Sequence, residues 1–197
     1  MALLCIETST RRCSAALSNG GDVVSYRAND EGNHAATLAV YLDELMSDAH
    51  RRGLIPEAVV LSEGPGSYTG LRIGCAMAKG LCYGLHIPLM VLKTTQIIAA
   101  RMEGKERVAM IDARRSEVYT ATYDENLNEL SPVEAKVLAP EVKQAWFAHE
   151  VQPDAEVMPR MVEMGLARTI SGKDIAYYEP YYLKEFVAAP SHVKGLK

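Results

Sequence analysis

The segment from Gly64 to Gly74, with sequence GPGSYTGLRIG, has the residue types and spacing of a site that binds anions. It follows the apolar run 58–61, which is typical of a buried strand, and it opens a helix that is rich in small residues. Ser67 or Thr69 can cap that helix by accepting a hydrogen bond from a backbone N–H group. Because glycine turns at helix N-termini bind phosphates, phosphate binding is the first chemistry to consider.

A phosphate loop is nevertheless not the favoured interpretation of this turn. It lacks the lysine of a Walker A loop, and the next strand candidate ends in Lys93 rather than in the acidic residue of a dinucleotide site. Two alternatives are a tight turn inside a packed α/β core and close packing of the helix against a neighbour. Gly70 and Gly74 share one helix face, and Ala76, Gly80 and Gly84 repeat the same spacing on another. We favour helix packing, because an interior glycine costs roughly 1 kcal/mol relative to alanine.

Carboxylates and hydroxyls at strand ends are the other candidates for chemistry. Glu7 ends the first apolar run and precedes Thr8 and Ser9, and Asp112 ends a later run and precedes Arg114. These residues would line a vestigial cleft, since a fold keeps such groups after its activity is lost. No two of the five histidines lie three or four residues apart, and the four cysteines form no CxxC pair. The pattern predicts no catalytic residue, no metal site, and buried thiols in a reducing compartment.

The elements that position these residues can be placed from apolar periodicity and turn signals. Five strands are expected first, over 3–7, 14–18, 23–26, 58–61 and 89–92, with helices over 35–50 and 69–84. Residues 107–112 and 118–123 then repeat the first hairpin, with a carboxylate at the strand end and an Arg-Arg pair in the turn. The repeat predicts an α/β protein of two related lobes, residues 1–101 and 102–197, each with a mixed sheet and flanking helices. A chance match of two short hairpins is the alternative.

The composition is that of an ordinary globular protein. Hydrophobic residues make up 48% of the 197 residues, and the formal net charge of -4 argues against a dedicated polyanion binder. No apolar run approaches the ~18 residues of a membrane span, and the N-terminus shows no signal-peptide pattern. The chain is expected to be cytoplasmic.

Four features together resemble the bacterial TsaB family, which helps to make the threonylcarbamoyl modification of tRNA adenosine. They are ETST at 7–10, the 64–74 signature, IDAR followed by EVY at 111–119, and EPYYL at 179–183. The glycine signature alone would also fit the paralogous catalytic family, TsaD. The resemblance implies the actin-like, sugar-kinase-type fold that the internal repeat also suggests.

The chain departs from the family pattern at three places. Glu7 stands where most relatives have aspartate, a carboxylate that helps to place metal and phosphate in active ATPases of this fold. Lys93 and Ile97 stand where the catalytic paralogue has two metal-binding histidines. The chain is also shorter than most relatives within 139–160. The resemblance therefore implies the non-catalytic partner, with no cofactor of its own and with ATP or ADP bound only in a complex.

The resemblance further implies an accessory subunit that activates a TsaD-like paralogue by heterodimerisation through the helices over 35–50 and 69–84. It implies a TsaE-like ATPase as third partner, tRNA held only through the complex, no membrane association, and a homodimer when the chain is alone. Arginines of the two repeated turns could add tRNA contacts if those turns converge at the cleft. The alternative is a small ATPase or kinase of the actin-like fold with its own nucleotide site. The residues expected at the partner interface are Leu38, Tyr41, Leu45, Tyr68, Gly70, Leu71, Gly74, Met77 and Ala78.

Overall fold

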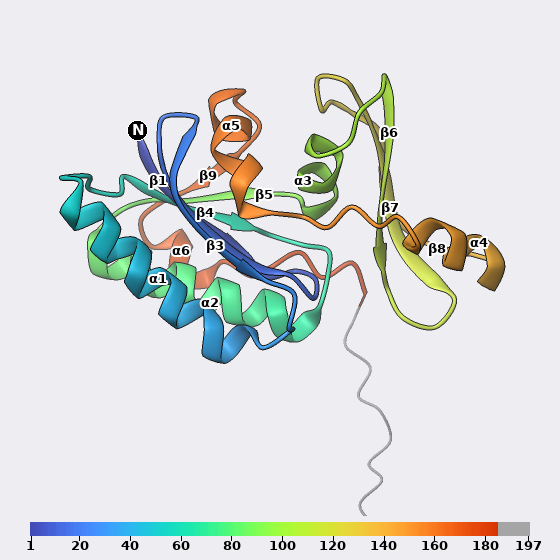
Figure 1. Ribbon diagram of the computed structural model, residues 1–197, viewed down its shortest axis with the longest axis horizontal. Coiled ribbons are helices and arrows are strands. Elements are labelled where there is room, and N and C mark those ends of the chain that lie inside the picture. The colour runs from blue at the N-terminus through green and yellow to red at the C-terminus, as the bar shows by residue number, and fades with distance from the viewer. Residues whose placement is uncertain (185–197) are drawn as a thin grey trace, which may run out of the picture.

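A six-stranded sheet with strand order β3-β2-β1-β4-β5-β9 forms the larger part of the molecule (Figure 1). The computed structural model describes residues 1–184. β1, β4 and β5 are parallel, whereas β2, β3 and β9 run antiparallel to their neighbours. The five strands expected first are confirmed, with ends that differ by at most three residues. The strands are Ala2–Glu7 (β1), Cys13–Asn19 (β2), Asp22–Asn29 (β3), Ala58–Ser62 (β4), Leu89–Leu92 (β5) and Arg168–Ile170 (β9).

Both faces of this sheet are buried, which explains why its central strands are apolar without alternation. Leu4 and Ile6 pack in the core under α1 (His34–Arg51) and α2 (Tyr68–Leu85), which lie on one face. Leu3 and Cys5 point the other way. The second core is covered by α3 (Thr94–Ala100), the short 3-10 helix η1 (Ala155–Val157) and α5 (Met158–Glu163). Ser67 caps α2 by accepting from the Gly70 N–H, as expected from the sequence.

A smaller three-stranded sheet stands beside the first, with strand order β6-β7-β8 (Figure 1). Its strands are β6 (Glu106–Asp112), β7 (Glu117–Asp124) and β8 (Glu129–Val137). All of its pairings are antiparallel, so the expectation of a mixed sheet in the second lobe is wrong. The β6–β7 hairpin does repeat the arrangement of β1 and β2, with Asp112 and Glu7 at equivalent strand ends.

The second sheet stays antiparallel because the chain leaves it after β8. It forms α4 (Pro140–Phe147) and then returns to the first sheet, where η1 and α5 pack and β9 pairs with β5. The last helix within the described residues is α6 (Asp174–Tyr177). The division into lobes at residue 101 stays a prediction. No helix within residues 1–184 is long and apolar enough to cross a membrane.

Candidate functional site

The glycine-rich turn between β4 and α2 is filled by the protein's own chain. A methyl group at Gly70 would overlap the carbonyl oxygen of Thr8, and one at Gly66 would overlap that of Ser9. On the other side, the Tyr181 carbonyl oxygen lies 2.5 Å from the place of a Cβ atom on Gly64, which has φ +113°. The Ser67 N–H donates to the Ser9 carbonyl at 2.6 Å. The small residues therefore accommodate the β1–β2 turn and the C-terminal segment, which is the packed-turn alternative.

This packing reverses the expected orientation of α2. A side chain at Gly74 would overlap the Thr8 hydroxyl and approach Leu61 to 3.3 Å, so Gly74 faces the protein's own sheet. Gly70 faces it too, and neither can present its face to a partner. Four more residues expected at the interface are core residues with at most 1% exposure, so that expectation is also wrong for them: Leu38, Leu45, Leu71 and Ala78. Tyr41, Tyr68 and Met77 are half-buried.

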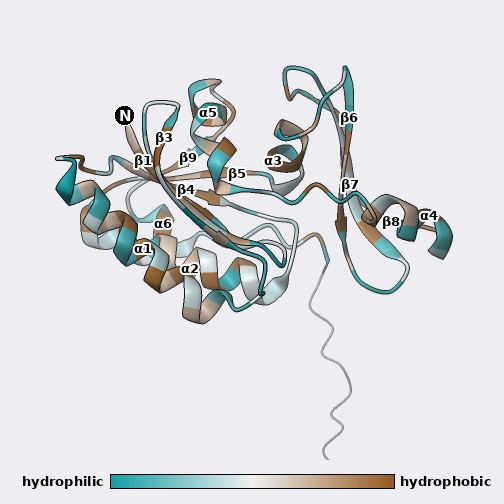
Figure 2. Ribbon diagram, viewed as in Figure 1, coloured by the Kyte–Doolittle hydropathy of each residue, from teal (hydrophilic) through white to brown (hydrophobic). Residues whose placement is uncertain are grey.

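The second set of small residues on α2, the one expected from the spacing of Ala76, Gly80 and Gly84, lies on the side of the helix that faces away from the sheet. Ala76, Gly80 and Gly84 are exposed, and among residues 1–184 nothing outside the helix backbone lies within 4 Å of a Cβ atom built on Gly80 or Gly84. Tyr83 is 83% exposed on the same helix, and Val40 is 53% exposed on α1. Figure 2 shows α2 mostly in white and brown, whereas α1 carries more teal. We call this surface, made by Val40, Ala76, Gly80, Tyr83 and Gly84, the outer helix face.

Glu7, expected in the vestigial cleft, is fully buried at the end of β1. Its Oε1 accepts hydrogen bonds from the N–H and the hydroxyl of Ser9, both at 2.5 Å. Its Oε2 has no hydrogen-bond partner within residues 1–184. Burial raises the pKa of Glu7 to about 7, although the neighbouring Ser62 hydroxyl and the hydrogen bonds from Ser9 oppose the shift. The Thr8 side chain is also bound within the protein, because its hydroxyl donates to the Gly70 carbonyl at 2.8 Å. These residues bind the protein's own chain.

Asp112 and Arg114 occupy the β6–β7 turn, and neither forms a hydrogen bond or ion pair with Glu7. The exposed Asp112 carboxylate accepts from Lys143 Nζ of α4 at 2.6 Å and from the Arg114 N–H at 2.7 Å. The expected pairing of Asp112 with Glu7 is therefore not made. Within residues 1–184, no group of three or more His, Cys, Asp or Glu side chains is placed to hold a metal. The four cysteines are buried thiols, as expected.

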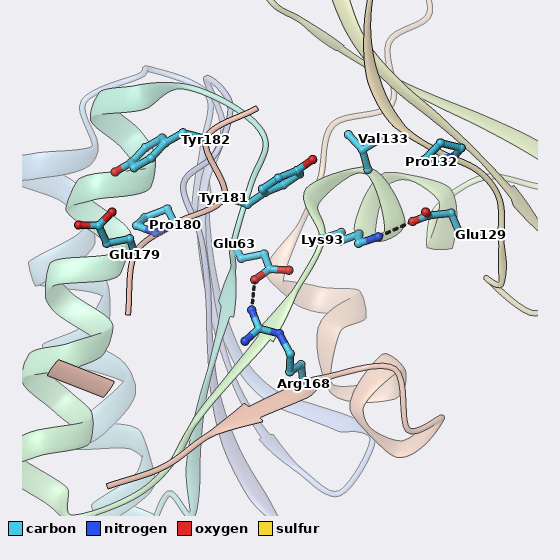
Figure 3. A pocket seen from close by; sticks show the side chains of 10 residues that line it. All are labelled: Glu63, Lys93, Glu129, Pro132, Val133, Arg168, Glu179, Pro180, Tyr181 and Tyr182. Carbon is cyan, nitrogen blue, oxygen red and sulfur yellow. Dashed lines mark hydrogen bonds and ion pairs between the residues drawn. The ribbon is translucent and has the colours of Figure 1, made fainter. Parts of the chain in front are cut away.

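A cleft of about 520 Å³ lies between the two sheets, but none of the residues expected in a vestigial cleft lines it (Figure 3). It lies at the carboxyl ends of β4 and β5, where α/β sheets commonly bind ligands. Glu63 accepts from Arg168 Nη2 at 2.8 Å, and Lys93 pairs with Glu129 across the cleft. Tyr181 lies above Glu63 and Lys93 in Figure 3, and its N–H donates to the Glu63 carbonyl at 2.7 Å. Only the EPYYL motif could have indicated this segment.

The chain is similar in sequence to proteins of known families. A family model described as TsaD, tRNA N6-adenosine threonylcarbamoyltransferase, matches residues 27–185. The TsaB protein of Escherichia coli K12 is 34% identical over 72% of this chain and 64% of its own length. That of Bacillus subtilis 168 is 33% identical over 62% of this chain and 55% of its own length. The chain belongs to the TsaB/YeaZ family.

Solved structures agree with this membership at the level of the fold. YeaZ from Pseudomonas aeruginosa superposes with a TM-score of 0.70 at 24% identity, covering 92% of this chain and 99% of that one. A second crystal structure, titled as an uncharacterized protein similar to peptidase YEAZ from Pseudomonas aeruginosa, gives 0.71 at 23% identity over 93% and 99%. The chain spans less than two thirds of the length of the curated TsaB relatives named above. The family match includes α1, α2, the glycine-rich turn and the segment at Tyr181.

Proposed function

We propose that this chain is an accessory, non-catalytic subunit of the machinery that makes threonylcarbamoyladenosine in tRNA. Its relatives carry the name tRNA threonylcarbamoyladenosine biosynthesis protein TsaB. In this role it forms a heterodimer with a TsaD-like paralogue and holds that catalytic subunit in an active arrangement. A TsaE-like ATPase completes the complex in the cytoplasm, and tRNA binds through the assembly. The two sheets are the cores of two actin-like lobes, the second one shortened.

The outer helix face is the observation that carries this proposal. Gly80 lies in the interior of an 18-residue helix, where glycine is costly, and no atom of residues 1–184 outside that helix backbone lies within 4 Å of a Cβ atom built on it. By contrast, Gly70 and Gly74 are explained by contacts with Thr8. A surface of glycine and alanine lets a second helix approach closely; the exposed Tyr83 offers apolar area on the same helix, and Val40 is exposed on the neighbouring helix α1. The same face serves the homodimer of the isolated chain.

Several features support a non-catalytic role. Lys93 and Ile97 stand at the positions of the metal-binding histidines of the catalytic paralogue; Lys93 is paired with Glu129, and Ile97 is 0% exposed. Neither side chain provides the metal ligand that histidine provides. Glu7, at the position of a phosphate-placing carboxylate, is sealed in the core by Ser9.

The alternative, an ATPase or kinase, is favoured by one observation, the position of the cleft at the ends of β4 and β5. The charges in that cleft oppose it. Its two cations, Lys93 and Arg168, already pair with Glu129 and Glu63, and Glu179 adds a third carboxylate to the lining. A nucleotide needs cations that are free to contact its phosphates.

Sedimentation of the chain with its TsaD-like paralogue tests the proposal. We expect one species with the mass of a heterodimer, and two separate species would contradict it. Calorimetry of the isolated chain with ATP and Mg²⁺ tests the alternative, since micromolar affinity would favour an enzyme. Weak or absent binding fits the accessory role.

A further inference from the structure

The β6–β7 turn presents two arginines in a backbone conformation that arginine rarely adopts. Arg114 has φ +67° and Arg115 has φ +51°, both in the left-handed region. For an L-residue with a Cβ atom this conformation is unfavourable, and turns that need it normally contain glycine or asparagine. Strained residues of this kind persist where the surrounding structure enforces them, and they cluster at functional sites. The strained backbone therefore makes this turn a candidate functional site.

The surrounding structure does enforce this conformation. Lys143 Nζ enters from α4 and donates to Asp112 Oδ1 at 2.6 Å, to the Arg115 carbonyl at 2.7 Å and to the Glu117 carbonyl at 3.2 Å. Asp112 Oδ1 also accepts from the Arg114 N–H at 2.7 Å. Only 14% of the Lys143 side chain is exposed, so this lysine is built into the turn. The two arginines are therefore held on a rigid support.

The repeated turn between β1 and β2 provides an internal comparison. There, Arg12 is bound by Asp154 at 2.6 Å and by Asp30 at 2.9 Å, and Arg11 Nε donates to the Asp30 carbonyl at 2.8 Å. The arginines of the first turn are thus used inside the protein. The exposed side chains of Arg114 and Arg115 have no hydrogen bond or ion pair to any residue in 1–184. The second turn leaves two guanidinium groups free for a ligand.

The charges around the turn favour an anion. Lys143 pairs with Asp112, and Lys184 pairs with Glu117. A third carboxyl, Glu150, also lies close enough to Asp112 to interact with it, and burial raises its pKa. Even with this third carboxyl counted as ionised, four cations face three acids, and the two unpaired cations are the exposed arginines. In Figure 1 the turn lies at the lower end of the small sheet, near the place where the described chain ends.

We propose that the Arg114–Arg115 turn is a contact site for RNA phosphates and adds a second hold on the tRNA that the complex modifies. The inference rests on the proposed function, which supplies RNA as the substrate. Two neighbouring guanidinium groups suit two phosphates of a nucleic-acid backbone, because each fork can donate two parallel hydrogen bonds to one phosphate. The contact reads no sequence, and its strength falls with salt as counterions return to the phosphates. The partner subunit still provides the main affinity.

A double variant separates binding from folding. Arg114→Asn with Arg115→Gly puts residues that tolerate the left-handed region into the turn, so the melting temperature of the isolated chain should rise by a few degrees. In the heterodimer, the affinity for an unmodified tRNA transcript should fall roughly tenfold at about 50 mM salt. The slope of log K against log salt should become shallower by roughly one to two. The affinity between the two protein subunits should not change.

Arg160→Ser is the matched control, because Arg160 is an exposed arginine on α5, and it should alter neither affinity nor slope. Unchanged tRNA affinity and slope in the double variant would overturn the proposal. So would a loss of subunit affinity in place of tRNA affinity, since the turn would then dock on protein. Failure of the proposed function would be seen separately, as no heterodimer with the unaltered chain. The same salt titrations on the isolated chain would then decide the phosphate contact.

Discussion

Arg12 and Asp154 form an ion pair that fastens the returning C-terminal part of the chain to the first sheet. Arg12 Nε lies 2.6 Å from Asp154 Oδ2, and the Asp154 side chain is only 1% exposed. The Tyr26 hydroxyl donates to the same oxygen at 2.8 Å. This contact joins residues 142 positions apart and sets where η1 begins.

Arg12→Met should therefore destabilise the protein strongly, because it removes the hydrogen-bonded cation of a buried carboxylate and leaves only Arg101 Nη1, 3.9 Å from Asp154 Oδ2. The free energy of unfolding, measured with urea at pH 7, should fall by about 3 kcal/mol or more. Arg11→Met is the control, since Arg11 is exposed, and it should change that free energy by less than about 0.5 kcal/mol. Equal effects of the two substitutions would show that the Asp154 contact is not important for stability.

Glu7 predicts a pH dependence of stability. Its pKa is raised to about 7 in the folded protein, so between about 4.5 and 7 the folded state holds a proton that the unfolded state has lost. The contribution of Glu7 to stability thus decreases as pH rises through this window and stays low above it. Glu7→Gln mimics the protonated form and should remove this decrease, raising the free energy of unfolding at pH 8 by up to about 3 kcal/mol.

Urea titrations of both proteins at pH 5 and pH 8 check this prediction. The difference between unaltered protein and Glu7→Gln should be small at pH 5 and large at pH 8. A variant that is less stable at both values would show that Glu7 works as a hydrogen-bonded carboxylate.

Adding one methyl group to each of the two small-residue faces of α2 should change the free energy of unfolding in opposite directions. Gly74→Ala must displace Thr8 or Leu61 and should lower the free energy of unfolding by about 1–3 kcal/mol. Gly80→Ala meets open space and should raise it by about 0.5–1 kcal/mol through helix propensity. Thermal unfolding followed by circular dichroism measures both. The same sign for both substitutions would contradict the orientation of α2.

The isolated chain should not transfer the threonylcarbamoyl group. Purified protein, given tRNA, the threonylcarbamoyl adenylate and divalent metal, should leave the tRNA unmodified, because Lys93 and Ile97 provide no metal ligands. Nucleoside analysis by mass spectrometry checks this. Metal-dependent product from the chain alone would make it an enzyme.

Much of the fold could be predicted from local patterns. Continuous apolar runs place the strands of the first sheet, and the 3.6-residue period places α1 and α2. The same period shows that α2 has two small-residue faces, but it cannot say which one is inside. That depends on Thr8, which is 62 residues from Gly70 in the chain. Gly70 and Gly74 were expected at the partner interface for this reason, and the structure places them against Thr8.

Contacts between distant segments were beyond sequence patterns altogether. The ion pair between Arg12 and Asp154 and the hydrogen bond between Tyr181 and Glu63 both join irregular segments. No periodic pattern of residues in the sequence indicates either contact. The left-handed backbone at Arg114 and Arg115 could not be predicted either, because arginine is not a residue type that indicates it. The all-antiparallel second sheet follows from where the chain goes after α4, a segment without clear periodicity.

The affinity between this chain and its TsaD-like paralogue, compared for two glutamate substitutions, tests the central claim most directly. Gly80→Glu places a charge on the outer helix face, and Ala145→Glu places one on the exposed side of α4. By sedimentation equilibrium, Gly80→Glu should weaken the heterodimer by at least a hundredfold while its melting temperature is kept, since burying an unpaired charge is costly. Ala145→Glu should bind like the unaltered chain. Full affinity of the Gly80→Glu variant would contradict the assignment of this face to the partner.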